Sequence, residues 1–137
     1  FNSFKRPICL WNYENNIRGV INRKGVIAGW GSDENNLVST EPKMLEVSIA
    51  DPDWCLRSND EIARHTTNRT FCAGDRNGKG PCHGDSGTGI SIIENGRWTL
   101  RGLVSATLNK RKSDDCDFKE FTIYTDVAQF IPWILAS

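Results

Sequence analysis

A glycine-rich stretch, residues 80–89 (GPCHGDSGTG), constrains the local fold of this chain more than any other segment. Four glycines surround a cysteine, a carboxylate and a hydroxyl, and each glycine inside a helix or strand costs roughly 0.5–1 kcal/mol relative to alanine. The stretch therefore predicts a tight turn whose backbone N–H groups point at a ligand. Ser86 in this turn is a candidate nucleophile, because neighbouring N–H groups can bind the oxyanion that its attack on a carbonyl produces.

Short apolar segments separated by polar turns make up most of the remaining chain. Asn95 and Gly96 predict a tight hairpin, because both central residues of a type I′ turn need a positive φ. Six strands are predicted, at residues 25–31, 44–50, 70–73, 90–93, 98–105 and 121–124. This pattern predicts an all-β fold, a six-stranded antiparallel β-barrel with a C-terminal α-helix.

Two helices are predicted outside the strands. Asp51 and Pro52 predict the start of a short helix, followed by a loop over residues 58–68. Residues 126–135 carry apolar side chains on one helical face and predict a closing helix, which Pro132 should weaken or kink. Residues 1–24 are expected to be irregular apart from a short apolar segment around Cys9.

Charge and length exclude several classes of function. The 137 residues include 17 basic and 17 acidic ones, so the zero net charge gives no argument for a nucleic-acid or anionic-membrane partner. No apolar run approaches the roughly 18 residues that a membrane helix needs. The chain begins at Phe1 without an initiator methionine or a signal-peptide pattern, and we expect it to be a piece of a longer protein. No metal-ligand cluster is visible, so neither a metal nor another cofactor is expected.

The cysteine content points to an oxidising compartment. No C-x-x-C pair is present, and two bridges with one cysteine left over are typical of a secreted chain with a partner outside the visible sequence. The sequon Asn68-Arg69-Thr70 agrees, and marks Asn68 as a candidate for glycosylation. We therefore expect a secreted, extracellular protein.

The motif around Ser86 separates two classes of serine hydrolase. The α/β-hydrolase elbow requires G-x-S-x-G, but Thr88 occupies the last position and alternating β-α units are missing. The chain instead resembles the C-terminal half of the chymotrypsin/trypsin-like serine peptidases, family S1. The matching landmarks occur in family order: Arg6-Pro7-Ile8-Cys9-Leu10, Gly29-Trp30-Gly31, Phe71-Cys72-Ala73-Gly74, Gly84-Asp85-Ser86-Gly87, Leu103-Val104-Ser105, Tyr124-Thr125-Asp126-Val127 and Trp133-Ile134. The variant ending Thr88-Gly89 resembles some secreted arthropod members.

This resemblance implies an arrangement of domains and disulfides. Residues 1–24 would cross over from a missing first barrel, and residues 25–137 would form the second barrel with its C-terminal helix. The resemblance pairs Cys55 with Cys72 and Cys82 with Cys116. It also implies that Cys9 links the domain to an upstream regulatory region.

The resemblance also implies roles for three consecutive residues of the glycine-rich stretch. Ser86 would be the nucleophile, and the N–H groups of Gly84 and Ser86 would form the oxyanion hole, where one donor is worth roughly 3–4 kcal/mol in the transition state. Asp85 would be the buried carboxylate that pairs with the α-amino group released by zymogen cleavage. The alternative for Ser86 is a turn serine without chemistry, and for Asp85 a residue that merely caps the turn.

A serine nucleophile needs a histidine base and an acid that orients this base. The chain contains only His65 and His83. His65 lies in a polar segment and is expected to be a solvated histidine, and His83 falls at a position on the pocket rim that varies freely in the family. The resemblance places the catalytic histidine and aspartate in the first barrel, so this chain alone is expected to be inactive.

Family positions also imply a substrate preference. Gly80 would form the floor of the substrate pocket and offers no charge for arginine or lysine, while Thr107 and Thr122 would narrow its walls. Ser105 would offer its backbone to the substrate strand. Ala106 replaces the usual tryptophan beside it, which departs from the pattern. These positions predict cleavage after small or medium uncharged residues.

The sequence therefore predicts a serine endopeptidase of the trypsin-like family that acts on protein or peptide substrates through an acyl-enzyme on Ser86. It predicts no nucleic-acid and no membrane partner. Two alternatives remain: a catalytically inactive protease homologue that acts as a binding or cofactor module, and a secreted β domain without peptidase ancestry. The first is favoured by Ala106 and the two wall threonines and opposed by the presence of Gly84 and Ser86.

Overall fold

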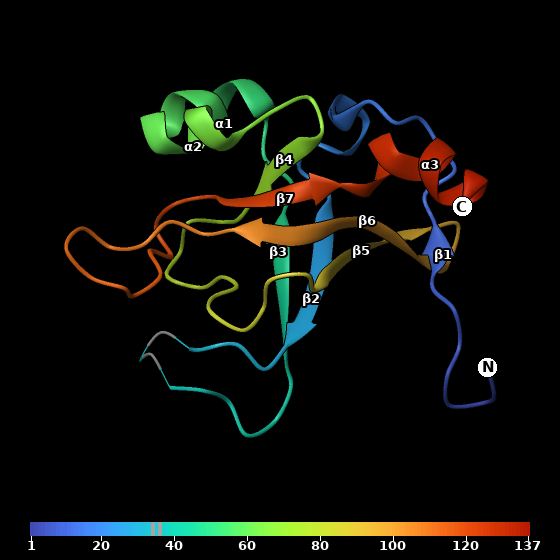
Figure 1. Ribbon diagram of the computed structural model, residues 1–137, viewed down its shortest axis with the longest axis horizontal. Helices are drawn as coiled ribbons and strands as arrows, with labels where there is room; N and C mark the ends of the chain where they lie inside the picture. Colours follow the sequence, from blue (N-terminus) through green and yellow to red (C-terminus); the bar gives the residue numbers. More distant parts are fainter. Residues whose placement is uncertain (34, 36) are drawn as a thin grey trace.

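Six antiparallel strands wrap around an apolar core (Figure 1) in the computed structural model, which describes residues 1–33, 35 and 37–137. They are neighbours in the order β3-β2-β5-β6-β7-β4. Between the two outer strands, Ala50 N–H donates to Cys72 O (2.9 Å) and Gly74 N–H donates to Ser48 O (3.0 Å). The predicted antiparallel barrel is therefore confirmed. The strands are β2 (Lys24–Gly29), β3 (Lys43–Ser48), β4 (Thr70–Ala73), β5 (Gly89–Glu94), β6 (Arg97–Ala106) and β7 (Thr122–Asp126).

Alternation along the strands fills the barrel interior. Val47 and Ile49 are buried, while Glu46, which directly precedes Val47, faces solvent. Phe71 of β4 and Tyr124 of β7 stack with their ring centroids 5.3 Å apart. The removal of such side chains from water supplies the main favourable free energy of the fold.

The hairpin between β5 and β6 has the predicted turn. Asn95 and Gly96 have φ values of 48° and 74°, as a type I′ turn requires. Strand β6 also contains two irregularities that the sequence pattern did not predict. Its pairing with β5 skips Arg101, and its pairing with β7 skips Ser105. Such bulges change the direction of the side chain or backbone at one position without ending the strand.

The first bulge buries a charged side chain. The Arg101 guanidinium lies 3.2 Å from the Asp126 carboxylate (Nε to Oδ1) and 4.6 Å from the centroid of the Trp11 ring. It also donates to Asn15 O at 3.2 Å. Burial lowers the pKa of Arg101, and the negative charge of Asp126 opposes this shift. The cluster ties the segment before β2 to the centre of β6 and the end of β7.

The helices follow the predicted pattern only in part. Helix α1 (Pro52–Ser58) begins as expected, since the Asp51 side chain accepts a hydrogen bond from Asp53 N–H. The predicted loop over residues 58–68 is wrong, because helix α2 (Asp60–His65) forms there. Asn59 caps it by accepting from Glu61 N–H, and acidic residues in the first turn and basic ones in the last complement the helix dipole. Figure 1 shows α1 and α2 together beside β4.

The chain termini also differ in detail from the prediction. The closing helix is split into a 3-10 turn, η2 (Val127–Phe130), and helix α3 (Ile131–Ala136). Pro132 lies in the first turn of α3, where the missing N–H costs no hydrogen bond, so it starts the α-helix instead of kinking it. Residues 1–24 include β1 (Cys9–Leu10), which pairs in parallel with β6, and a 3-10 turn, η1 (Ile17–Val20).

Within the part of the chain that the structure describes, no helix combines the length and the apolar character needed to cross a membrane.

Candidate active site

Residues 80–88, which we call the Ser86 loop, lie between β4 and β5 and contain two successive tight turns. Asp85 N–H donates to Cys82 O (2.9 Å), and Thr88 N–H donates to Asp85 O (3.0 Å). Gly84 has a φ of +93°, a conformation that a side chain would strain. The turns leave the Ser86 residue exposed.

Strand β6 holds the Ser86 loop from one side. Gly87 N–H donates to Val104 O (2.8 Å), and Val104 N–H donates to Thr88 O (2.9 Å). The next residue, Ser105, is the bulged one that β7 does not pair with, and it is exposed. A backbone segment without a β partner therefore follows directly after the contact with the loop, and such a segment can accept an added peptide strand.

The backbone amides of the loop differ in their partners. Asp85, Gly87 and Thr88 donate to carbonyl groups. Within the described residues, the N–H groups of Gly84 and Ser86 donate to no protein acceptor. Both residues are exposed, so their amides are not buried polar groups left unsatisfied. Two such donors beside a hydroxyl can bind a developing negative charge.

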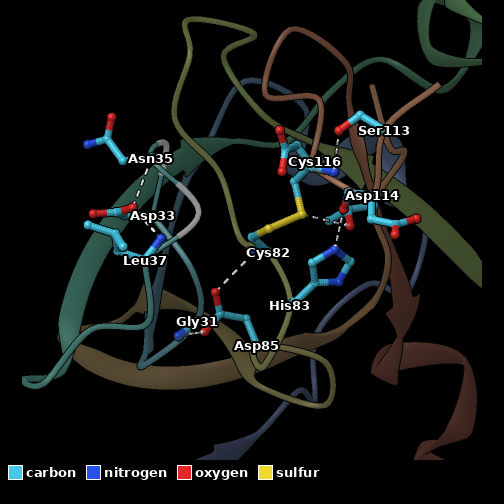
Figure 2. Close-up of a disulfide and its surroundings, with 12 residues drawn as sticks. Gly31, Asp33, Asn35, Leu37, Cys82, His83, Asp85, Ser113, Asp114 and Cys116 are labelled. Carbon is cyan, nitrogen blue, oxygen red and sulfur yellow. Dashed lines mark hydrogen bonds between the residues drawn. A yellow bond between two sulfur atoms is a disulfide. The ribbon is translucent and has the colours of Figure 1, made fainter. Parts of the chain in front are cut away.

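Asp85 is the buried residue of the loop and anchors it to the end of β2. Its carboxylate accepts from Gly31 N–H (2.8 Å) and from Cys82 N–H (3.0 Å), as Figure 2 shows. A Cβ atom at Gly29 or Gly31 would overlap this carboxylate, so the close approach depends on glycine at both positions. The cysteine-bearing turn and the G-W-G segment are thereby joined through one side chain.

A cavity of about 290 Å³, which we call the Asp85 cavity, lies against this carboxylate. Asp85, Gly31, Gly80 and Phe118 are among the residues that line it.

Burial raises the pKa of the Tyr124 phenol far above its usual range, and the negative charge of Asp85 raises it further. Asp85 therefore acts electrostatically on the barrel interior as well as on the loop.

Both disulfides that the resemblance implies are present. Cys55 of α1 is bonded to Cys72 of β4, and Cys82 of the Ser86 loop is bonded to Cys116. Sulfur and ring-nitrogen atoms of Cys82, His83 and Cys116 lie within 4.8 Å of one another, but the two sulfur atoms are bonded to each other and offer no thiolate to a metal. Cys9 is half-buried and forms no disulfide with the described residues.

Each histidine ring makes a hydrogen bond to a backbone carbonyl. His83 Nε2 lies 2.6 Å from Asp114 O, and His65 Nδ1 lies 2.8 Å from Glu61 O. Because a carbonyl oxygen can only accept, each of these ring nitrogens must carry the hydrogen. Figure 2 shows the His83 ring directed at Asp114 and away from the Asp85 carboxylate.

Of the three positions expected to shape a substrate pocket, Gly80 lines the cavity beside Asp85, and the two threonines lie elsewhere. Gly80 borders the Asp85 cavity, and a Cβ at Gly80 would lie 3.1 Å from Phe118 Cδ1. Thr122 is buried on β7 opposite Ala73, and Thr107 lies half-buried with its Oγ1 3.7 Å from Cys116 Sγ. Neither threonine is among the residues that line the Asp85 cavity.

Sequence reasoning missed two residues of this region. Phe118 follows Cys116 in a charged loop, and nothing in the local pattern indicated that its ring packs against Gly80. Tyr124 was placed in a predicted strand and a family landmark, but its complete burial was not predicted, because both faces of β7 are buried. The role of Gly31 as an Asp85 partner depends on two segments that lie far apart in the sequence.

Comparison with known proteins decides the family. The family model of trypsin matches residues 1–134, almost the whole chain. This chain belongs to the trypsin family. The resemblance to trypsin-like serine proteases inferred from the ordered landmarks is confirmed, and with it the interpretation of the barrel as a trypsin-like one.

Relatives of this trypsin-family chain include insect proteases. "Serine protease gd" of Drosophila melanogaster is 32% identical over 167 aligned positions, covering 99% of this chain and 32% of that protein. "CLIP domain-containing serine protease HP8" of Bombyx mori is 29% identical over 140 positions, covering 99% and 37%. "Melanization protease 1" of Drosophila melanogaster is 29% identical over 142 positions, covering 98% and 34%. The chain thus spans about a third of the length of the curated relatives it matches.

Proposed function

We propose that Ser86 is the nucleophile of a serine endopeptidase and that this chain supplies one part of its active site. The observation that carries the proposal is the exposed position of Ser86 in a turn where the amides of Gly84 and Ser86 donate to no acceptor among the described residues. The hydroxyl would attack a peptide carbonyl to form an acyl-enzyme, and the two amides would bind the oxyanion. Water would then release the acyl group.

The base and its orienting acid come from residues outside this chain. The chain has two histidines, and family position puts neither of them at the place of the base: His65 lies in α2 and His83 lies three residues before Ser86. In the proposed enzyme the first barrel supplies the histidine and aspartate, and residues 1–24 are the crossover between the barrels. The chain alone would therefore retain the fold but not the activity.

Asp85 is proposed to be the activation-linked carboxylate. Its two hydrogen bonds from backbone amides and the adjacent cavity of about 290 Å³ support this role. A protonated α-amino group entering that cavity would pair with a buried charge, which is otherwise costly to keep without a partner. Because Asp85 directly precedes Ser86, this pairing would fix the shape of the Ser86 loop.

The substrate is proposed to carry a small or medium uncharged residue before the scissile bond. Gly80 carries no charge that would attract arginine or lysine, and the Phe118 ring lies beside it. Thr107 and Thr122 would narrow the pocket, and Ser105 would bind the substrate backbone. Ala106 beside it removes a large wall and would weaken substrate binding.

The wider setting is proposed to be extracellular. Two disulfides in one small barrel support an oxidising compartment, since such bonds are rare in reducing ones. Cys9 would form a bond to an upstream regulatory region of a zymogen. Asn68 is exposed in the turn between α2 and β4, which supports its glycosylation.

The test uses the full-length protein that contains this chain, activated by limited proteolysis, and a library of peptide substrates. We expect cleavage after alanine, valine or threonine and weak cleavage after arginine or lysine. Ser86→Ala should lower kcat by about six orders of magnitude, as the loss of a serine nucleophile does elsewhere. His65→Gln, in a helix of its own, is the matched control and should keep full activity.

Two results would count against this proposal. Efficient cleavage after arginine or lysine would overturn the pocket assignment while leaving the nucleophile in place. A correctly processed protein that cleaves nothing would favour the alternative of a non-catalytic homologue that acts as a binding or cofactor module. Ala106, at a position where the family usually has tryptophan, is the feature that keeps this alternative open.

A further inference from the structure

Residues 107–117 form a small hairpin, which we call the basic hairpin, beside the Ser86 loop. Two backbone hydrogen bonds define its stem: Lys110 N–H donates to Asp115 O and Asp117 N–H donates to Leu108 O, both at 2.7 Å. Asn109 and Cys116 form an isolated antiparallel bridge within the same stem. The stem of the hairpin is thus an ordered structure.

Two contacts join the basic hairpin to the Ser86 loop. The disulfide from Cys82 to Cys116 holds the second arm of the stem, and His83 donates to Asp114 O at 2.6 Å (Figure 2). Cys82 and His83 lie four and three residues before Ser86. The base of the hairpin is therefore bound both covalently and by a hydrogen bond to the segment that carries the nucleophile.

The tip consists of three consecutive basic residues, Lys110, Arg111 and Lys112, all exposed. Among the described residues none of the three forms an ion pair with a carboxylate within 4.0 Å. The backbone of Arg111 and Lys112 forms a turn, and Lys112 has a φ of 60°. Only one further backbone bond, from Ser113 N–H to Lys110 O at 3.1 Å, spans the tip.

Four other basic residues are less accessible to a protease. Arg57 and Arg64 lie inside helices α1 and α2, and Arg101 is buried. Arg76 is exposed, but its side chain is held by a hydrogen bond to Lys119 O and by the Phe121 ring. A protease needs an accessible segment that it can extend, and exposed loop tips are the preferred sites of nicking.

We propose that the tip of the basic hairpin is a processing site for an endopeptidase that cleaves after lysine or arginine. Water adds across the Lys110–Arg111, Arg111–Lys112 or Lys112–Ser113 peptide bond, leaving a carboxylate on one side and an ammonium group on the other. The inference that a second enzyme performs the cut rests on the proposed function, in which the pocket of this chain does not accept basic residues. Accessibility of the tip does not depend on that function.

The processed protein stays covalently connected. The segment after the cut contains Cys116, and its disulfide to Cys82 joins it to the rest of the chain. Only the weak turn bond across the tip is lost, since both hydrogen bonds of the stem lie outside the three scissile bonds. Processing therefore changes the rim beside Ser86, adding two new charges there, without removing a piece of the barrel.

The experiment uses the full-length protein with the Ser86→Ala substitution, so that its own activity plays no part. Traces of pancreatic trypsin are added, and samples are analysed with and without a reducing agent. We expect an early product that begins at Arg111, Lys112 or Ser113 and separates only after reduction. The near-ultraviolet circular dichroism of the tryptophans should be retained in the nicked protein.

One triple variant and one double variant provide the matched comparison. Lys110→Gln, Arg111→Gln and Lys112→Gln together should abolish this product, whereas Arg57→Gln with Arg64→Gln should not change it. Protein purified from its native source should contain the same reducible fragment. A native protein uncut at this hairpin, a first trypsin cut elsewhere in residues 25–137, or a fragment released without reduction would each overturn the proposal.

The outcomes separate this inference from the proposed function. If the tip resists cleavage while wild-type protein hydrolyses peptides through Ser86, the processing site is wrong and the nucleophile stands. If the tip is cut in native protein but Ser86 shows no activity, the processing site stands on a non-catalytic homologue.

Discussion

Replacing Asp85 by asparagine should loosen the Ser86 loop while the barrel around it stays folded. The carboxylate accepts two backbone hydrogen bonds, from Gly31 and from Cys82. Asparagine keeps one oxygen for one of these bonds, but its NH₂ group then faces the other amide. One charge-assisted hydrogen bond is lost, and one backbone N–H in a buried site has no acceptor.

The expected fall in the free energy of local opening follows from these two losses. A hydrogen bond to a charged group contributes about 1.5–3 kcal/mol, and leaving a buried donor unpaired costs about 1–3 kcal/mol. Since the two terms overlap, we expect the free energy of local opening to fall by about 2–4 kcal/mol. At 1.36 kcal/mol per factor of ten, amide exchange in the loop should accelerate roughly 30- to 1,000-fold. A domain stability of about 5–15 kcal/mol tolerates this loss.

The assay is hydrogen–deuterium exchange with mass spectrometry on the full-length protein, read at the amides of Gly87 and Thr88. Asp33→Asn is the control, because Asp33 also accepts from two backbone amides, those of Asn35 and Leu37, but within its own loop. The control should leave exchange in the Ser86 loop unchanged. Unchanged exchange in Asp85→Asn, or equal acceleration in β5 and β6, would refute the local anchoring role.

Three further predictions concern buried groups. Stability should fall above pH 10 by up to about 1.4 kcal/mol per pH unit, because the unfolded chain releases the Tyr124 proton and the folded one, whose pKa is raised, does not. In alkaline unfolding titrations Tyr124→Phe should remove this fall, and Tyr13→Phe, at an exposed position, should not. Arg101→Met should cost roughly 3–5 kcal/mol in urea unfolding by leaving Asp126 buried without its partner, and adding Asp126→Leu should restore most of the loss. Gly31→Ala should displace the Asp85 carboxylate and produce the exchange pattern of Asp85→Asn, and an unchanged pattern would show that the carboxylate has room to move.

Local chemistry explains which parts of the fold could be predicted. The Asn95-Gly96 turn and the Asp51 cap each depend on residues that are neighbours in the sequence, and both are present. Helix α2 was missed because it spans only Asp60–His65, too few residues for a periodic apolar pattern. Its one local signal was Asn59, a favourable cap followed by acidic residues. The bulge at Arg101 depends on pairing with β5 and on Trp11, so no window of neighbouring residues encodes it.

The candidate site likewise has features that neighbouring residues determine and features that depend on long-range contacts. The turn around Ser86 follows from its glycines, and its family assignment follows from ordered landmarks. The contact of Asp85 with Gly31 joins residues 54 positions apart, and the packing of Phe118 against Gly80 joins two loops. Such contacts are set by the closed barrel and by the Cys82–Cys116 disulfide, and they became visible only in the structure.

Labelling with a fluorophosphonate tests the central claim, the nucleophilic role of Ser86, most directly. The full-length protein is activated by limited proteolysis and treated with the reagent, and the adduct is located by peptide mass spectrometry. We expect an adduct on Ser86 that forms in the folded protein and not after denaturation or in Ser86→Ala. No adduct on Ser86 after confirmed activation, or an adduct on another residue, would contradict it.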